Sequence, residues 1–250
     1  MNGDYGRICI DLIDGRLDAV RVPSVISREL CDGVLRALRE VRFDWYDESR
    51  VFPPIARFGP TLNDFTKRGM LRSDYWPAMA EVMSSCKDVP SLTDIHSVAL
   101  KRLSELLARP VGSATIGGRR VYCGTVREMS NGARVHFDDV ATEFLSFPFD
   151  QRVLTQLSFV VCLSAPRAGG ETVIWERGPV AEDENSRVGY GYDESVVADL
   201  AFVKFRPIVG DGLLFRCDRL HSVMSAEEGR RVSLNFFVGV TDEQTAVVWS

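Results

Sequence analysis

The chain has 250 residues, 45% of them hydrophobic, and its 30 basic and 35 acidic residues give a net charge of −5. A chain of this length can form one large β domain, and an acidic balance without a run of Lys or Arg disfavours a nucleic-acid partner. The polar start Met1–Tyr5 is unlike a signal peptide, no stretch has the roughly 18 apolar residues of a membrane-spanning helix, and the six cysteines lack C-x-x-C spacing, so we expect a cytoplasmic protein with reduced thiols and no membrane partner.

The first predicted elements are a hairpin and a helix. Apolar and polar residues alternate over 7–22 around Asp14-Gly15, which predicts a hairpin at the edge of a sheet. A helix follows with Ser27 as a candidate N-cap, because apolar residues recur at helical spacing as far as Val41.

An irregular region and two more helices come next. Residues 44–71 are rich in aromatic and turn-forming residues, and long loops of this kind in compact proteins are often functional. Apolar spacing then predicts helices over 75–85 and 92–108. His96 falls on the second of these, where nothing nearby completes a metal site, so we expect a hydrogen-bonded structural residue.

Strands dominate from residue 119 onward. The pattern predicts about eight strands separated by turn signals, as a jelly roll requires, over 119–129, 133–137, 153–163, 171–175, 201–207, 212–215, 222–225 and 231–240. Residues 139–148 form either a short helix or a loop that contacts substrate, and the polar insert 176–195 could fold over the mouth of a site. We expect one domain over 1–250, in which 1–118 flank a core formed by 119–250.

Three polar side chains form a candidate metal site. His136 and Asp138 are two residues apart, so in a strand both point to one face and can reach one ion. Such a pair also occurs in solvated edge strands, but His221 adds a second imidazole in a strand-rich context. Two imidazoles and one carboxylate on one face of an iron leave three positions open, as in the facial triad of non-haem iron sites.

A buried cation follows the distal histidine. Arg231 and Ser233 share one face of a strand that is otherwise largely Val, Leu and Phe. A charge that points into such a strand needs a partner. A planar guanidinium beside a hydroxyl is suited to gripping the far carboxylate of a dicarboxylate.

These motifs resemble the Fe(II)/2-oxoglutarate-dependent oxygenases, which have a double-stranded β-helix core. The resemblance rests on His136-x-Asp138, His221, Arg231-x-Ser233 and the turn Gly169-Gly170-Glu171 between two strands, and it covers about residues 121–250. It implies a mainly β fold with flanking α-helices, that is, a cupin-like jelly roll with N-terminal helices. It also implies Fe(II), 2-oxoglutarate and O2, with His136, Asp138 and His221 on the iron and with Arg231 and Ser233 on the 2-oxoglutarate.

Within this superfamily the C-terminal pattern is similar to that of the free-standing halogenases of hapalindole-type alkaloid pathways. Those halogenases have Gly where this chain has Asp138, and the Gly leaves a metal position for chloride. Because Asp138 fills that position here, the resemblance implies a hydroxylase-type dioxygenase.

Three further residues are candidates for binding. Arg127, on the strand before the metal loop, could bind the co-substrate, could orient a substrate carboxylate or could be a surface cation. Asp139 could bind a substrate amine or cap a helix. Phe58 could line an apolar substrate pocket, together with Phe52 and Phe65, or could belong to the core. No catalytic residue is expected beyond the metal ligands.

The predicted function is oxidation of a C–H bond in a small molecule, most simply hydroxylation in secondary metabolism or amino-acid modification. Desaturation, epoxidation or ring formation would use the same cofactors, and substrate positioning decides among them. A non-catalytic jelly-roll binding protein and an oxygenase acting on protein or nucleic acid are the alternatives of other classes. The chain is expected to be a monomer or a homodimer.

Overall fold

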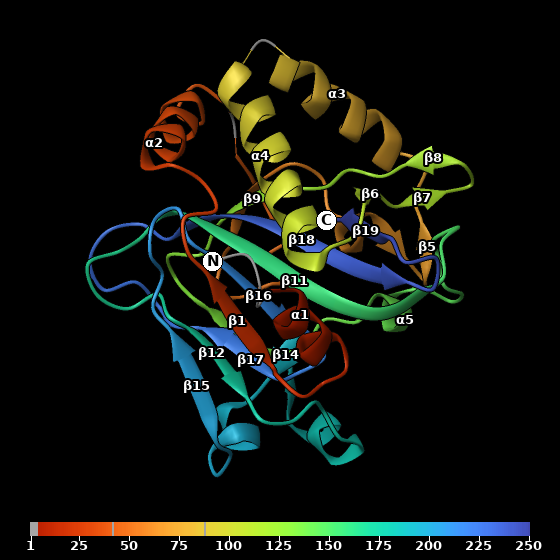
Figure 1. The fold of residues 1–250 in the computed structure, drawn as a ribbon. Coiled ribbons are helices and arrows are strands. Elements are labelled where there is room, and N and C mark those ends of the chain that lie inside the picture. Colours follow the sequence, from red (N-terminus) through yellow and green to blue (C-terminus); the bar gives the residue numbers. More distant parts are fainter. Residues whose placement is uncertain (1–4, 42, 88) are drawn as a thin grey trace.

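Two β-sheets form the centre of the fold, and helices cover the outer face of the larger sheet (Figure 1). The computed structural model describes residues 5–41, 43–87 and 89–250. In the nine-stranded sheet the order is β1 (Ala19–Val22), β16 (Gly212–Arg216), β11 (Val153–Ser164), β18 (Val232–Thr241), β9 (Thr125–Glu128), β3 (Ala56–Phe58) and β2 (Asp44–Trp45), and β19 (Ala246–Trp249) pairs with both β18 and β6 (Val111–Ser113). In the six-stranded sheet the order is β13 (Arg187–Val188), β14 (Gly191–Tyr192), β10 (Ala133–His136), β17 (His221–Val223), β12 (Thr172–Trp175) and β15 (Phe202–Phe205).

This is the mainly β jelly roll with flanking helices that the strand pattern predicted. The predicted strands are confirmed with ends displaced by a few residues, except that the strand over 119–129 is broken. Gly124 has a φ of +82°, which interrupts the extended chain and separates β9 from a small hairpin of β7 (Thr115–Ile116) and β8 (Arg119–Arg120). Strands β6 and β19 were not predicted, and neither was the hairpin of β4 (Thr66–Lys67) and β5 (Met70–Leu71).

The helices lie mostly in the first half of the chain: α1 (Tyr5–Ile13), α2 (Arg28–Ala37), α3 (Tyr75–Lys87), α4 (Pro90–Leu107) and the short α5 (Val140–Glu143). The three helices predicted after residue 22 are confirmed. Ser27 caps α2 as expected, because its hydroxyl accepts a hydrogen bond from the Leu30 N–H at 3.2 Å.

The predicted hairpin over 7–22 is wrong in its first half, where the chain forms α1. Cys9 and Leu12 of this helix are buried in the core. They lie three residues apart, which is the spacing of a helix and not of a strand. Gly15, with a φ of +75°, ends the helix in the left-handed conformation that favours glycine. The apolar–polar alternation in the first half of this segment therefore belongs to a helix and not to a strand, and only β1 is a strand.

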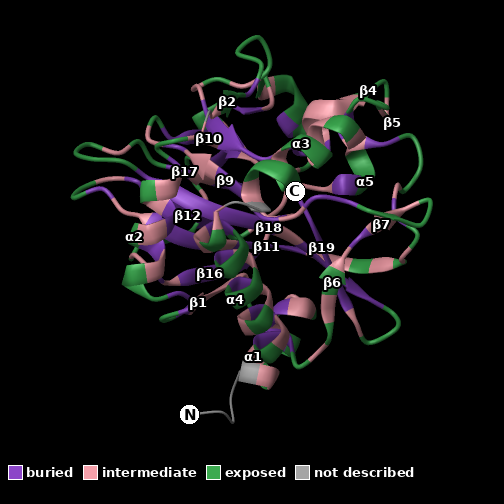
Figure 2. Ribbon diagram, turned by 90° about the horizontal axis from the view of Figure 1, so that it is seen from above, coloured by how far each residue is buried: buried purple, intermediate pink, exposed green. Residues whose placement is uncertain are grey.

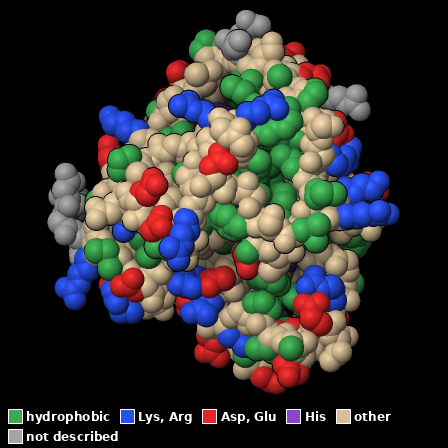
Figure 3. All heavy atoms as spheres, turned by 90° about the vertical axis from the view of Figure 1, so that its right-hand side faces the viewer, with side chains coloured by type: hydrophobic (Ala, Val, Ile, Leu, Met, Phe, Trp, Pro, Cys, Tyr) green, Lys and Arg blue, Asp and Glu red, His purple; other side chains and the backbone are tan. Residues whose placement is uncertain are grey.

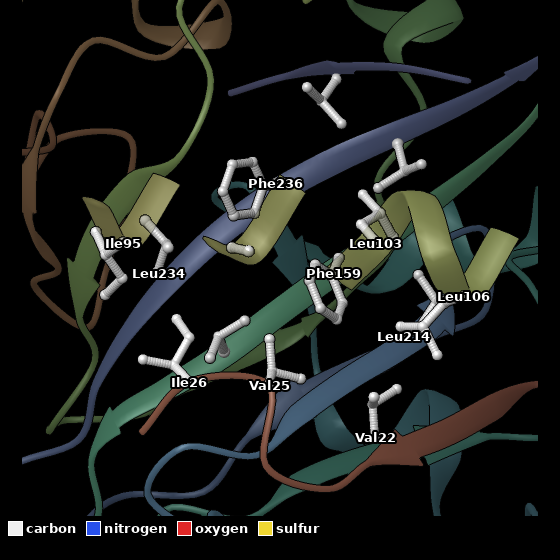
Figure 4. Close-up of a cluster of buried hydrophobic side chains, with 14 of the residues drawn as sticks. Val22, Val25, Ile26, Ile95, Leu103, Leu106, Phe159, Leu214, Leu234 and Phe236 are labelled. Atoms are coloured by element: carbon white, nitrogen blue, oxygen red, sulfur yellow. The ribbon is translucent and has the colours of Figure 1, made fainter. Parts of the chain in front are cut away.

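Side-chain alternation along the central strands builds the core. Phe159 of β11 and Phe236 of β18 point toward α4, where they meet Leu103 in a fully buried cluster (Figure 4). Burying a side chain of this size contributes about 1.5–3 kcal/mol. Most residues of β11, β12, β16 and β18 are buried (Figure 2). The intervening residues of β18, such as Ser233, point to the other face of the sheet, which is the interior of the jelly roll.

The boundary predicted at residue 118 divides one continuous sheet. Strands β1, β3 and β6 precede it and pair with strands that follow it, and β2 extends the same sheet by pairing with β3. All six cysteines are free thiols. His96 is the structural residue that was expected: its Nδ1 lies 2.6 Å from the Leu92 carbonyl oxygen and its Nε2 lies 2.8 Å from that of Gly124. No helix within the described ranges is long and apolar enough to cross a bilayer.

Candidate metal centre

The two histidines of the predicted triad face each other across a strand pair. His136 ends β10, His221 begins β17, and the two are cross-strand partners with ring centroids 4.2 Å apart. A bulge lies between Ala133 and His136, so that both of these residues pair with inward-facing residues of β17. Simple alternation would have placed Arg134 beside His136, and the bulge replaces it with Ala133 at the wall of the site.

Asp138 completes the set from just beyond the end of β10. Its backbone N–H donates to the Cys217 carbonyl oxygen at 2.8 Å, which fixes the chain as it leaves the strand. One Asp138 oxygen, Oδ2, lies 3.3 Å from His221 Nε2 and 3.9 Å from His136 Nε2. One ligand atom from each of the three residues lies within 4.8 Å of the others. The donor set and spacing suit a divalent transition metal such as Fe(II).

Backbone carbonyls orient both imidazoles. His136 Nδ1 lies 2.7 Å from the Arg134 oxygen and His221 Nδ1 lies 2.9 Å from the Arg219 oxygen. A carbonyl oxygen only accepts, so each Nδ1 bears a hydrogen and each Nε2 is left with its lone pair toward the shared space. Hydrogen bonds of this kind fix the tautomer and the ring orientation of metal-binding histidines.

The ionisation states also suit a metal. Burial, together with the neighbouring His221, lowers the pKa of His136 to about 4. Burial alone would raise the pKa of Asp138, but the contacts with His221 and His136 outweigh it and lower that pKa to about 2. At neutral pH His136 is therefore neutral and Asp138 is ionised, which are the forms that coordinate a metal.

Arg231 is a buried cation without an acidic partner among the described residues. It is 4% exposed, its Nε donates to the Gly170 carbonyl oxygen at 2.9 Å, and its Nη2 donates to Thr172 Oγ1 at 3.1 Å. Its Nη1 is buried with no hydrogen-bond partner, and burial lowers the pKa of this guanidinium to about 10. A buried charge of this kind calls for an anion, and the terminal carboxylate of 2-oxoglutarate fits it.

Ser233 lies beside Arg231 and is 2% exposed. Both residues line a small cavity of about 40 Å³ that Thr172 and Cys162 also line. Ser233 pairs with Arg127 across β18 and β9. Arg127 lines a different and larger cavity, together with His136 and Asp138. The neighbouring pair Ser233 and Arg127 therefore links the Arg231 cavity to the metal site.

The larger cavity has a volume of about 440 Å³, and two residues of the triad, His136 and Asp138, line it. Its wall includes Tyr190, whose ring lies edge-on to His136 with centroids 5.4 Å apart and whose hydroxyl accepts from the Arg134 N–H at 2.8 Å. Tyr190 and Gly189 come from the insert 176–195, so the expectation that this insert reaches the mouth of the site is confirmed.

Two of the residues predicted to contact substrate, Phe58 and Asp139, do not line this cavity. Phe58 is 6% exposed and packs in the core against the helices, because it alternates with Arg57 on β3 and Arg57 takes the inward face. The pocket role predicted for Phe58 is therefore wrong. Asp139 is the N-cap of α5, with its Oδ1 accepting from the Ala141 N–H at 2.9 Å, which confirms the capping alternative.

The cavity also contains residues that were not singled out from the sequence: Tyr46, Arg50, Asn63, Asp64 and Tyr190. All except Tyr190 belong to the irregular region 44–71. Its length and aromatic content were the only signals, and they indicated a functional loop without indicating which side chains face inward.

A jelly roll with this ligand set and a buried, unpaired arginine defines a class: the protein is a non-haem Fe(II)/2-oxoglutarate-dependent dioxygenase, which uses O2 as its second co-substrate. Residues 3–250 match the family described as carrier-protein-independent halogenase WelO5. The chain belongs to this family.

Two relatives are similar to this chain over most of its length. The L-γ-glutamyl-L-propargylglycine hydroxylase of Streptantibioticus cattleyicolor is 37% identical over 243 residues, which cover 96% of this chain and 91% of that protein. The leucinostatins biosynthesis cluster protein S of Purpureocillium lilacinum is 28% identical over 205 residues, 76% of this chain and 79% of that protein.

Solved structures share the fold. The N-substituted L-amino acid dioxygenase of Burkholderia ambifaria, in complex with α-KG, superposes with a TM-score of 0.63 at 15% identity and covers 98% of this chain and 91% of that chain. HygX of Streptomyces hygroscopicus, with nickel and 2-oxoglutarate bound, gives a TM-score of 0.52 at 15% identity over 95% and 87%.

Proposed function

We propose that this enzyme hydroxylates a C–H bond of an amino-acid-derived small molecule, with His136, Asp138 and His221 as the iron ligands. The observation that carries the proposal is that the three ligand atoms lie within 4.8 Å of one another, with His136 and Asp138 at the wall of a 440 Å³ cavity. The relative named as a hydroxylase of L-γ-glutamyl-L-propargylglycine supports both the reaction and the substrate class.

Arg231 and Ser233 would hold the far carboxylate of 2-oxoglutarate. The unpartnered Nη1 of Arg231 would donate to one carboxylate oxygen, and Ser233 lines the same small cavity. Arg127, the cross-strand partner of Ser233, is proposed to contact either 2-oxoglutarate or a carboxylate of the substrate.

The bound iron, with 2-oxoglutarate and O2, supplies the oxidising chemistry, in which one oxygen atom enters the substrate C–H bond and the other enters succinate as CO2 leaves. The protein keeps Asp138 ionised and His136 neutral, positions the substrate C–H bond toward the metal ligands, and excludes water from the site. Tyr190, packed against His136, closes one side of this space.

Asp138 favours hydroxylation over halogenation. A carboxylate at this position fills the site where a halide would have to bind the metal, although the family is named for halogenases. Desaturation, epoxidation or ring formation would proceed at the same centre. A cytoplasmic location and a monomeric or homodimeric state stay predictions from the sequence.

The test is anaerobic reconstitution of metal-free protein with Fe(II) and 2-oxoglutarate. Chelation of the keto acid by the metal gives a weak visible charge-transfer band, and we expect this band to appear in the wild type and to be lost in His221→Ala. A folded protein with adequate iron and no band would overturn the proposal and would favour a non-catalytic binding protein.

A further inference from the structure

The cavity beside the triad is lined by two arginines, Arg50 and Arg127, and by two aspartates, Asp64 and Asp138. Burial raises the pKa of the Asp64 carboxyl group, and Arg57, Arg50 and Arg127 oppose that rise. Arg57 takes Asp64 as its ion-pair partner, with Nη2 2.7 Å from Oδ2, and its Nη1 donates to the Gly59 carbonyl oxygen. Within the described part of the chain, Arg127 and Arg50 have no ion pair.

Arg127 is half-buried, and its guanidinium lies 5.8 Å from the ring centroids of both Tyr46 and Phe237, within cation–π range. These ring contacts favour one position of the guanidinium and leave its N–H groups available for hydrogen bonds. A fixed, unpaired guanidinium in a cavity is an anion site.

Three polar atoms of the cavity wall lack any protein partner. They are Arg127 Nε, the Tyr46 hydroxyl and Asn63 Oδ1, all buried and without a hydrogen bond. Tyr46 as a whole is 6% exposed. Buried polar atoms nearly always have a hydrogen-bond partner. Three such atoms without a partner, on residues that line one cavity, therefore indicate that a polar ligand binds there.

The chemistry of these atoms defines the ligand. Arg127 and Tyr46 offer hydrogen-bond donors, which suit a carboxylate. Asn63 Oδ1 is an acceptor, which requires an N–H donor on the ligand. In an N-acyl α-amino acid the amide nitrogen and the carboxylate are attached to the same α-carbon, so one ligand end presents both the N–H donor and the acceptor oxygens.

We infer that this wall recognises the carboxyl end of an N-acyl α-amino acid, with the carboxylate on Arg127 and Tyr46 and the amide N–H on Asn63. Arg50, exposed at the cavity mouth, adds a second cation that attracts the acid. This inference rests on the proposed function and assigns Arg127 to the substrate. The far carboxylate of 2-oxoglutarate belongs to Arg231, which lines a separate cavity.

The test measures binding to the enzyme loaded anaerobically with Fe(II) and 2-oxoglutarate, by the shift that a bound substrate causes in the visible band. The probes are a panel of N-acyl-L-amino acids that includes L-γ-glutamyl-L-propargylglycine, each with its C-terminal carboxamide and its N-methyl amide analogue. We expect at least one acid to bind about 10- to 100-fold more tightly than its carboxamide, as a charge-assisted hydrogen bond predicts.

The variants assign the two contacts. Arg127→Gln should remove the preference for acid over carboxamide, and Asn63→Ala should remove the preference for N–H over N-methyl, each leaving the other preference in place. Arg152→Gln is the matched control, because Arg152 is 79% exposed and lies outside the cavity; it should change neither preference.

Failure takes distinct forms. If the band forms but no acid on the panel binds, or if acids and carboxamides bind equally, the inferred binding of the carboxylate by Arg127 and Tyr46 is wrong. The proposed function is then unaffected. If Arg127→Gln weakens 2-oxoglutarate and leaves the substrate preference intact, Arg127 belongs to the co-substrate. Absence of the band in the wild type contradicts the proposed function itself.

Discussion

His136 and His221 lie opposite each other across the β10–β17 pair, with ring centroids 4.2 Å apart. Each ring is turned by a hydrogen bond from Nδ1 to the carbonyl oxygen two residues earlier in the chain. The same local geometry on two antiparallel strands therefore directs both Nε2 atoms to one point, where Asp138 meets them. The metal centre is a consequence of strand pairing rather than of a flexible loop.

Removal of either histidine should abolish iron binding while leaving the fold intact. His221→Ala deletes an Nε2 ligand from a partly preorganised site and should lower Fe(II) affinity by at least about 10- to 100-fold, with no turnover. Equilibrium dialysis of Fe(II) against the folded variant, checked by circular dichroism, measures this. His96→Gln is the control, because the two ring nitrogens of His96 lie at hydrogen-bond distance from the backbone oxygens of Leu92 and Gly124 and His96 is not one of the metal-ligand candidates; this variant should keep its iron. Full activity in His221→Ala would refute the triad.

Asp138→Gly should lose hydroxylation. The substitution removes the anionic ligand and leaves a vacant position on the metal, so that the substrate is no longer oxidised to the alcohol. Product analysis by mass spectrometry, with consumption of 2-oxoglutarate measured in parallel, separates loss of oxidation from loss of co-substrate binding. Alcohol formation at the wild-type rate would show that Asp138 is not a ligand.

Arg231→Ala should mainly raise the KM for 2-oxoglutarate. Loss of a charge-assisted contact costs about 1.5–3 kcal/mol, or roughly 10- to 150-fold in affinity. Thr172→Val removes only the hydroxyl that accepts from Arg231 Nη2 and should have a smaller effect. Steady-state kinetics with varied 2-oxoglutarate at saturating substrate decides the matter, and an unchanged KM in Arg231→Ala would exclude this residue from the co-substrate site.

Glu143 should make the metal-free protein less stable as the pH rises. Burial and the charge of Asp138 raise the pKa of Glu143 from its ordinary value of 4.5 to about 8. The folded state thus holds a proton that the unfolded state releases, so stability is fully present below about pH 4.5 and is lost as the pH rises to about 8, by on the order of a few kcal/mol.

Glu143→Gln cannot ionise and should lack this loss. Urea unfolding of both metal-free proteins between pH 6 and 9 should show a stability difference that grows in favour of the variant. The difference between the proteins isolates Glu143 from other titrating groups. Parallel curves over this range would mean that the carboxyl group ionises normally.

Gly124→Ala should destabilise the fold by about 1–3 kcal/mol. Gly124 has a φ of +82°, and an added Cβ would collide with the His96 ring and lie 2.9 Å from Phe236 Cε1. Gly112→Ala is the matched control, since a Cβ there meets nothing within 4 Å, and it should change the melting temperature little. Equal melting temperatures for the two variants would contradict the account of this break between β8 and β9.

The positions of most strands and a candidate ligand set could be predicted from the sequence because both depend on local pattern or on side-chain chemistry. Alternation predicted β11 and β18, helical spacing predicted α4, and His136-x-Asp138 with the distal His221 indicated a metal site. The local signal was wrong over α1, where apolar and polar residues alternate for a few positions although the buried Cys9 and Leu12 have helical spacing.

The amino-acid pattern alone specifies the chemistry of the candidate site: two imidazoles, one carboxylate and an arginine–serine pair on strands of a jelly roll. Which residues meet these groups depends on how the chain folds. The bulge before His136 put Ala133 at the wall, alternation on β3 turned Arg57 inward and Phe58 outward, and an irregular loop brought Tyr46 and Asn63 to Arg127. Such contacts depend on long-range pairing register, and no local periodicity encodes them.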